Sequence, residues 1–501
     1  MATPVNLTGT PAADTLFFES ADPITPKVEG FAGNDSIYLG ADLVGGLVDG
    51  GTGNDSIFLE GFNSTVGSIT DTTIKLGEGS DTLKLDYFQK ITGLFLNGNA
   101  GDDSILFDIN VDTLDSSRIL GGQGNDTFYF GVQESISNTS INGNEGNDSI
   151  FVGPTEVFDS QVFGGQGSDT IYISATTGSG LLVDGNIDDD SIFVKFTTSL
   201  EESEVFGGEG NDSLYFEVAT LLTTTVDGGN GDDSIYLSGT DAENVNVLAG
   251  SGNDTVQVLY TDFTDGFVQG LDGNDSIYVT DASGTTLINA NQGTDTLLGF
   301  LYDSARALGG QGNDSLYIYE LENDAIANGN KGDDTVYSAA QDGGEARGGE
   351  GDDYIFVTGT GGDVYGDKGA DTIDFGLGKF TANYAFGDTA LIGSIGWDSI
   401  QNFIDDVDAL ALESGPIVFN IAGLSGGITV VEGLATAGIS SLGQLIAAGQ
   451  SLTTEGALIA WDEFLFISDG SGTESEDLLI KNSATITKIT LTSGEITGLL
   501  V

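Results

Sequence analysis

The sequence predicts an all-β fold: a parallel β-roll or β-helix solenoid of about 17 coils with a C-terminal α+β or β cap. Two observations predict it. A glycine-rich turn that ends in aspartate recurs about every 21 residues, with its clearest copies at 121–126, 207–212 and 309–314. After each aspartate, aliphatic residues alternate with polar or aromatic ones, which is the period of a β-strand. A self-similar period of this length is typical of a solenoid.

The aspartates at the sixth position of these turns mark the coils and are the candidate metal ligands. They are Asp35, Asp55, Asp81, Asp103, Asp126, Asp148, Asp169, Asp190, Asp212, Asp233, Asp254, Asp275, Asp295, Asp314, Asp334, Asp353 and Asp371. They divide the chain into an N-terminal first coil or edge (1–29), a solenoid (30–377) and a cap (378–501). The last steps between them shorten to 20, 19 and 18 residues, so we expect narrower coils there.

Side chains two and four places after each aspartate, such as Ile171 and Ile173, are predicted to point inward and stack on the next coil. The residue two places before each turn is predicted to be buried as well. It is Val or Ile through most of the array and becomes Ala307, Ala327 and Ala346 near its end. The segments opposite the glycine turns, such as 197–204 and 238–244, are expected to be ordinary loops.

The turn itself explains the glycines and the acids together. Glycine reaches positive φ without steric cost, and asparagine is among the residues best tolerated there. Asparagine replaces the second glycine in five copies, at Asn99, Asn144, Asn186, Asn291 and Asn330. Such a turn directs backbone carbonyls and the aspartate carboxylate toward the gap between coils. Oxygen ligands without nitrogen or sulfur favour Ca²⁺, which takes more oxygens and looser geometry than Mg²⁺.

Composition excludes several classes of function. The chain has 13 basic and 78 acidic residues, a formal charge of −65, and no basic patch, so nucleic acid and anionic membrane are improbable partners. It has no histidine and no cysteine, which removes thiol nucleophiles, Ser-His-Asp triads and HExxH zinc sites. We therefore expect no enzyme activity. We also expect no membrane insertion and no cleaved N-terminal signal, because the required apolar segments are missing.

The turns resemble the calcium-binding nonapeptide repeats of the repeats-in-toxin (RTX) family, G-G-x-G-x-D-x-U-x, over about residues 30 to 375. The resemblance implies a calcium-binding β-roll and an uncleaved C-terminal type I secretion signal, and hence an extracellular or cell-surface location. In that family two nonapeptides make an 18-residue coil. This chain has one full turn per ~21 residues, so we expect one calcium column. A second binding edge is expected only near 343–344 and 361–362.

One ion in each of the 16 gaps between turns would add +32, about half of the −65. The alternative of solvated turns without metal is disfavoured, because carboxylates stacked ~5 Å apart repel each other. Folding and calcium binding are therefore expected to be linked.

The cap is predicted to contain a helix at 433–449, flanked by strands at 417–419, 428–431 and 464–467. The same region resembles the part of RTX proteins that closes the roll and carries the secretion signal. The N-terminal coil is predicted to leave a strand edge exposed.

Aromatic residues stand three places after the aspartate in 12 of 17 coils, where the alternation points them outward. They are Tyr38, Phe58, Tyr129, Phe151, Tyr172, Phe193, Tyr215, Tyr236, Tyr278, Tyr317, Tyr337 and Phe356. They form either a ladder that stabilises neighbouring strands, or a surface for lateral contact between copies or for carbohydrate.

Two functions are compatible with this sequence. The first is a secreted calcium-binding structural protein that folds and self-assembles on the cell surface, as an S-layer or extracellular filament component. Its partners would be other copies of itself and cell-surface polysaccharide. The alternative is a secreted adhesin or a polysaccharide-acting enzyme built on the same roll.

Overall fold

The computed structural model describes residues 2–62, 67–341, 343–359, 363–369 and 371–378, and nine further strands from β43 (Asn383–Ala385) to β51 (Glu495–Gly498). All secondary-structure elements within these residues are β-strands, and none of the described segments is a helix that could cross a membrane. The chain divides into two compact units, Met1–Tyr260 and Thr261–Val501.

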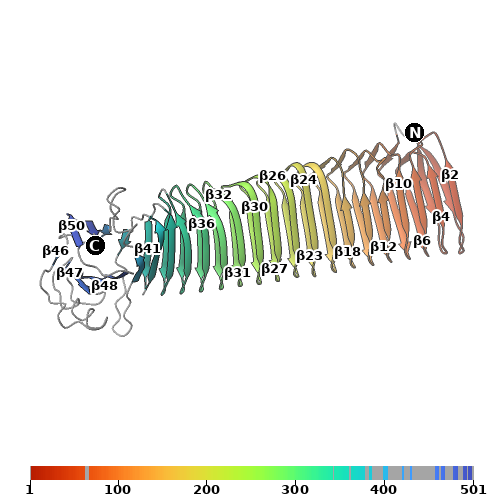
Figure 1. Cartoon of the computed structure of the whole chain (residues 1–501). Helices are drawn as coiled ribbons and strands as arrows, with labels where there is room; N and C mark the ends of the chain where they lie inside the picture. The colour runs from red at the N-terminus through yellow and green to blue at the C-terminus, as the bar shows by residue number, and fades with distance from the viewer. Residues whose placement is uncertain are drawn as a thin grey trace. The chain divides into compact units, whose positions relative to one another are not determined.

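In the first unit, one strand enters each glycine turn and another leaves it. The entering strands run from β3 (Ile24–Glu29) to β29 (Asn246–Ser251), and the leaving strands from β4 (Ser36–Gly40) to β28 (Ser234–Glu243). Each strand pairs in parallel with its equivalents in the coils before and after it, so the strands of this unit lie side by side (Figure 1). The predicted all-β parallel solenoid is confirmed.

Four strands from the middle of this unit illustrate two successive coils. They are β23 (Leu182–Ile187), β24 (Ser191–Glu201), β25 (Glu204–Glu209) and β26 (Ser213–Leu222). β25 pairs with β23, and β26 pairs with β24, in each case one coil apart. The turn between β25 and β26 ends at Asp212, so both arms of each turn are held by parallel strands.

The predicted loops opposite the glycine turns are mostly strand. Six early coils carry a short third strand there, from β5 (Leu43–Val44) to β20 (Glu156–Phe158). In later coils the leaving strand itself continues through this corner, as β24 does over 11 residues and β28 over 10. A register shift between Phe196 and Ser199 marks a bulge in β24. The loop prediction was wrong here, because a bulge bends a strand while its backbone groups stay paired.

The predicted core residues are buried. Ile171, Ile173 and Val205 are less than 1% exposed, as expected from the period of two. In the second unit, Ala307, Ala327 and Ala346 are also fully buried. Each of these alanines lies opposite the next in the parallel register. The small side chains near the end of the array are therefore core residues, as predicted.

The second unit continues the same pairing pattern from β31 (Phe267–Asp272) to β42 (Thr372–Gly378). Beyond it, β44 (Ser399–Phe403) pairs in parallel with β42. β46 (Thr429–Val430) and β48 (Phe464–Ser468) lie where the sequence predicts strands. The predicted helix at 433–449 and strand at 417–419 lie outside the described residues.

The glycine turns have the left-handed backbone that the sequence predicts. The second turn residue has φ of +118° at Gly122 and Gly208, and between +75° and +80° in the five copies with asparagine. The fourth residue also has positive φ, at Gly124 (+120°) and even at Asp188 (+79°), where the glycine is missing. Two left-handed residues two places apart therefore build each turn.

Replacing one of these glycines tests this account of the turn. A Cβ on Gly208 would lie 2.2 Å from the carbonyl oxygen of Asn186 in the preceding coil, in addition to the unfavourable φ. We expect Gly208→Ala to lower the free energy of unfolding in calcium by about 1–3 kcal/mol, measured by urea denaturation. Glu209→Ala, at the exposed neighbouring position, is the control and should change little. Equal stability of the two variants would contradict the account.

Candidate metal centre

The repeat aspartates form a hydrogen-bonded ladder along each unit. The backbone N–H of each aspartate donates to Oδ1 of the aspartate in the next coil, as from Asp190 to Asp212 and from Asp212 to Asp233, both at 2.7 Å. These N···O distances are 2.6–2.9 Å from Asp14 to Asp233 in the first unit. They are 2.7–3.0 Å between Asp275 and Asp371 in the second. The predicted metal ligands within each unit are thus brought together along one edge.

The second carboxylate oxygen is buried without a protein partner. All seventeen repeat aspartates are at most 3% exposed. In fourteen of them Oδ2 is both buried and free of any hydrogen bond within the described residues: Asp35, Asp55, Asp81, Asp103, Asp126, Asp148, Asp169, Asp190, Asp212, Asp233, Asp295, Asp314, Asp334 and Asp353. Burying a charged oxygen without compensation is strongly unfavourable, so a ligand is expected at these atoms.

The first glycine, present in most turns, lets oxygens of two coils approach closely beside this Oδ2 atom. A Cβ built on Gly121 would lie 2.1 Å from Oδ2 of Asp126 and 2.6 Å from the carbonyl oxygen of Gly143 in the next coil. A Cβ on Gly207 would likewise lie 2.5 Å from Oδ2 of Asp212 and 2.4 Å from the carbonyl oxygen of Gly228. A carboxylate oxygen and a carbonyl oxygen from adjacent coils therefore lie close together, where a side chain would collide with both.

This donor set fits a hard cation. It consists of oxygen atoms only, one of them carrying uncompensated negative charge, which is the ligand type that Ca²⁺ takes. Among the described residues, no group of three or more His, Cys, Asp or Glu side chains could hold a metal ion. An ion here would therefore need backbone carbonyls or water besides the aspartates. Three copies carry a side chain instead of the first glycine, at Leu76, Ala249 and Ala290.

Burial also raises the pKa of several of these carboxyl groups, among them Asp126 and Asp190. It raises the pKa of Asp126 to about 7 and that of Asp190 to about 8. The hydrogen bond from the preceding coil's N–H lowers each pKa in part, and the charges of neighbouring aspartates raise it again. The metal-free ladder therefore binds protons near neutral pH, where an isolated aspartate would be ionised.

A second ladder, which the sequence analysis missed, runs along the exposed tips of the turns. Here the residue at the fifth position accepts, through Oδ1, the backbone N–H of the same position in the next coil. Examples are Asn147 N–H to Asn125 at 2.8 Å and Asp232 N–H to Asn211 at 2.7 Å. In this second ladder the N–H group donates to the preceding coil, whereas in the first ladder it donates to the next coil. Asn or Asp at this position in 13 of 17 turns was the available signal.

A further missed pairing supports the turns that have asparagine at the second position. In all five of them the residue two places earlier is Asn or Asp. At Asn144 the backbone N–H donates to Oδ1 of Asn142 at 2.9 Å, and at Asn186 to Oδ1 of Asp184 at 2.9 Å. This local hydrogen bond holds the left-handed residue in place.

The predicted second binding edge is described only in part. Gly343 has φ of +96°, and the N–H of Gly344 donates to the carbonyl of Gln341 at 2.9 Å. Residues 361–362 lie outside the described residues. The number of ion columns stays a prediction.

Comparison with known proteins agrees with this geometry. A family model of the RTX calcium-binding nonapeptide repeat (4 copies) matches residues 115–133 and 137–154, which include the turns ending at Asp126 and Asp148. The matched repeats and the parallel β-solenoid together are those expected of an RTX β-roll protein. Searches of curated proteins and of solved structures gave no match. RTX repeats are calcium-binding motifs typical of type I secreted extracellular proteins, and RTX β-rolls are typically structural or adhesive rather than catalytic.

The two oxygens of one carboxylate can be tested separately with Asp212→Asn. The amide keeps an Oδ1 acceptor for the N–H of Asp190 but removes the buried charge. We expect this variant to be more stable than the wild type in chelator at pH 6, where the calcium-free protein should still be folded, and less stable in millimolar calcium at the same pH, each by roughly 1–3 kcal/mol. Thermal unfolding followed by circular dichroism measures both. Glu204→Gln, on the exposed side of β25, is the control for loss of charge, and effects of one sign in both buffers would count against the RTX site assignment.

The raised pKa values predict how the calcium-free solenoid depends on pH. A carboxyl group whose pKa is raised from 3.8 on folding stabilises the folded state fully below pH 3.8, and this contribution is lost as pH rises through the folded pKa. The ordinary value of 3.8 and the folded values of about 6 to 8 place that loss between about pH 4 and 8. In chelator, β-sheet circular dichroism should be retained at pH 5 and lost by pH 8, and calcium at pH 8 should restore it. Retention of the signal at pH 8 in chelator would refute this.

Proposed function

We propose that the chain is a secreted calcium-binding structural protein that folds outside the cell and self-assembles at the cell surface, as an S-layer or extracellular filament component. The observation that carries this proposal is the ladder of repeat aspartates, most of whose Oδ2 atoms are buried without a protein partner and close to a carbonyl oxygen of the next coil. Because the buried Oδ2 atoms need a ligand, the same ladder supports the proposal that folding requires calcium.

The thermodynamic argument is one of linkage. When the free calcium concentration is about ten times the Kd of a site, binding at that site stabilises the folded state by about 1.4 kcal/mol. The contributions of independent sites add. Fourteen aspartates with a buried, unpartnered Oδ2 atom therefore give calcium strong control over folding. Without calcium, a chain of charge −65 opposes its own compaction at neutral pH. Extracellular calcium would neutralise part of that charge.

The structural role is supported by what the coils contain. From Thr3 to Gly378 the described residues are repeated strands and turns. The side chains other than the turn aspartates serve mainly as core, as cross-coil hydrogen-bond partners or as stacked aromatics. The sequence contains no histidine or cysteine for catalysis. We therefore propose a non-catalytic function, with the secretion signal in 378–501.

Assembly in calcium is the decisive test. We expect the purified protein to be monomeric and poor in β-sheet in chelator at pH 7.5, and to form ordered sheets or filaments in millimolar calcium. Circular dichroism, light scattering and electron microscopy of one calcium titration measure folding and assembly separately. Magnesium at equal concentration and ionic strength is the control, and should be much less effective.

The outcomes separate the two candidate functions. Folding with assembly supports the structural protein. Folding in calcium without assembly at high concentration would contradict it and favour the secreted adhesin or polysaccharide-acting enzyme. No change of fold on adding calcium would overturn both, because each depends on the RTX sites.

A further inference from the structure

The leaving strands of the first unit carry two outward columns that are almost free of charge. The position one place after the repeat aspartate is an exposed Ser or Thr in all eleven coils from Ser36 to Thr255. The position three places after it is mostly aromatic, and the only charged residue in either column is Lys84. If the chain's 18% of charged residues were spread evenly, about four of these 22 positions would be charged, and most of those four would be acidic. We call these two columns the neutral strip.

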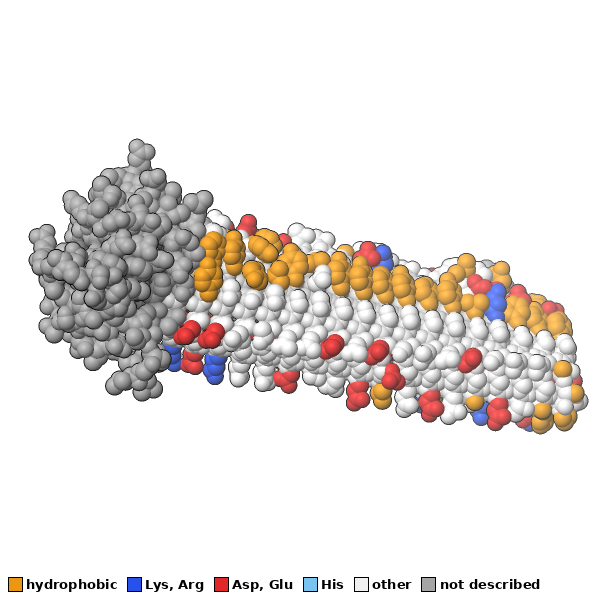
Figure 2. All heavy atoms as spheres, turned by 60° about the horizontal axis from the view of Figure 1, so that its bottom comes forward, with side chains coloured by type: hydrophobic (Ala, Val, Ile, Leu, Met, Phe, Trp, Pro, Cys, Tyr) orange, Lys and Arg blue, Asp and Glu red, His pale blue; other side chains and the backbone are white. Residues whose placement is uncertain are grey.

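Acidic side chains border the neutral strip on both sides. Asp102, Asp189 and Asp232 lie exposed at the turn tips on one side. Glu60, Asp108 and Glu217 lie on the other side, two places farther along the strands. Lys195 lies in the same column and pairs with Glu217 at 2.8 Å. Figure 2 shows the row of hydrophobic side chains with a band of uncharged atoms next to it, and acidic side chains farther out.

The single charge in the neutral strip is neutralised by this border. The ammonium group of Lys84 lies 3.0 Å from Oδ2 of Asp86 and 2.8 Å from Oδ2 of Asp108. It also lies 5.3 Å from the ring centroid of Phe58, the next aromatic residue in the column. Lys84 is therefore paired with two carboxylates and is not a free positive charge on the strip.

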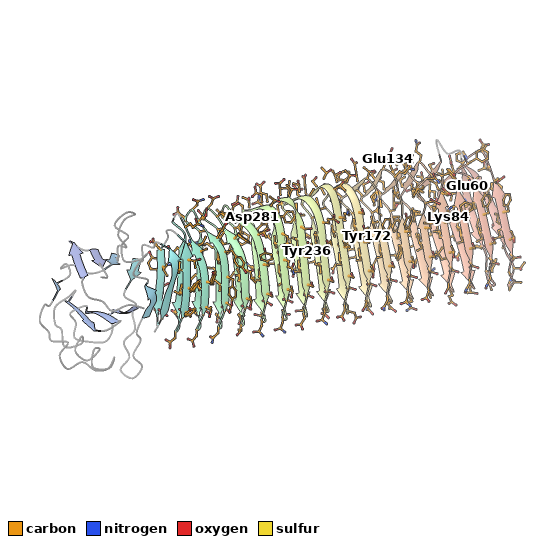
Figure 3. All side chains as sticks on the ribbon, viewed as in Figure 1. Glu60, Lys84, Glu134, Tyr172, Tyr236 and Asp281 are labelled. Carbon is orange, nitrogen blue, oxygen red and sulfur yellow. The ribbon has the colours of Figure 1, made fainter. Side chains whose placement is uncertain are left out.

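The aromatic rings of the strip form a continuous stack in the middle of the unit. From Tyr129 to Tyr236, six rings follow one another with centroids 4.6–5.4 Å apart and planes within 4–13° of parallel. Tyr172 and Tyr236 are labelled on this face in Figure 3. The predicted ladder is thus confirmed. Because each ring turns its faces toward its neighbours, mainly ring edges and tyrosine hydroxyls are left at the surface.

We propose that the neutral strip is the face through which two copies of this chain associate side by side, with strip against strip. This inference rests on the proposed self-assembly and names the surface that carries it. Any approach through the bordering acids brings like charges together in a protein of charge −65, whereas the strip presents none.

The dimensions of the strip suit such a contact. Eleven coils at ~4.8 Å give a length of about 50 Å, and two columns ~7 Å apart give a width of about 14 Å. Two copies would bury about 1,400 Å² in total, which is within the usual range for a specific interface. Rows of ring edges with the same spacing on both copies can interdigitate, as identical side chains do in stacked sheets. A two-fold axis would make the contact self-complementary.

The geometry favours a second copy over a polysaccharide. Carbohydrate platforms use exposed ring faces, and in this stack the faces of Phe151, Tyr172, Phe193 and Tyr215 are each covered by rings on both sides. What remains outside is a serine and threonine column and a row of ring edges. Such a surface packs best against one of the same shape and period.

Charge reversal across the proposed contact gives a direct test. Thr170 and Ser191 are exposed neighbours in register on adjacent strands of the strip. In millimolar calcium, Thr170→Glu with Ser191→Glu should weaken association at least tenfold by sedimentation velocity. Thr170→Lys with Ser191→Lys should do the same. An equimolar mixture of the two double variants should associate again, because opposite charges then meet across the contact.

A matched control lies on the other face of the coils. Ser140 and Gln161 are neighbours in register on the entering strands β18 (Ser140–Glu145) and β21 (Gln161–Gln166). Ser140→Glu with Gln161→Glu adds the same charge and should associate like the wild type. If the glutamate variants at 170 and 191 fail to fold in calcium, Tyr172→Ser with Tyr215→Ser and Tyr236→Ser tests the strip without added charge.

Each outcome decides the proposal. Association of the folded Glu variant at wild-type strength would overturn the neutral strip and leave the proposed self-assembly standing. Failure of the Glu and Lys variants to associate when mixed would also overturn it. A wild type that folds in calcium but stays monomeric would overturn both the strip contact and self-assembly. If that monomer binds insoluble neutral glucan and the Glu variant does not, the strip instead contacts polysaccharide.

Discussion

One constraint determines most of this structure: every coil buries a carboxylate whose Oδ1 is hydrogen-bonded to the neighbouring coil while Oδ2, in most coils, has no protein partner. The backbone N–H of Asp190 needs the carboxylate of Asp212, so neither turn is complete alone. The glycine at the first turn position lets Oδ2 and a carbonyl oxygen of the next coil approach closely, and those at the second and fourth positions supply the left-handed backbone. We therefore expect the fold to need a cation or protons at the buried oxygens.

Much of this could be predicted from the sequence, because the pattern repeats. The period of about 21 residues predicted parallel coils, the alternation predicted the buried Ile171 and Ile173, and the asparagine substitutions predicted left-handed residues. The continuous β24 was not predicted, since the irregular segment 197–204 has no repeated signal and a bulge leaves none. The seventeen metal ligands stay a prediction, although their burial and convergence on backbone oxygens agree with it.

The hydrogen-bond directions could not be derived from residue types. The turn aspartates accept from the preceding coil, whereas the fifth-position residues accept from the following one. A sequence pattern gives the face on which a side chain lies, but not which of two equivalent backbone N–H groups it accepts from. Together the two ladders connect each turn to both neighbours. Asn and Asp at the exposed fifth position therefore have a structural role, as shown by the hydrogen bond between Asp232 and Asn211.

The buried carboxylates and the aromatic rings of the outer face are carried by the same strands and the turns that precede them. From Asp169 onward the side chains point in, out, in and out: a buried carboxylate, the exposed Thr170, the buried Ile171 and the half-exposed Tyr172. Because the spacing is fixed by the backbone, whatever orders the carboxylates also sets the 4.6–5.4 Å spacing of the rings on the outer face. A chain that cannot bring its carboxylates together cannot present the neutral strip. If calcium orders the carboxylates, it would control both folding and the surface proposed for assembly, and that surface would stay unformed until the protein reaches a calcium-rich environment.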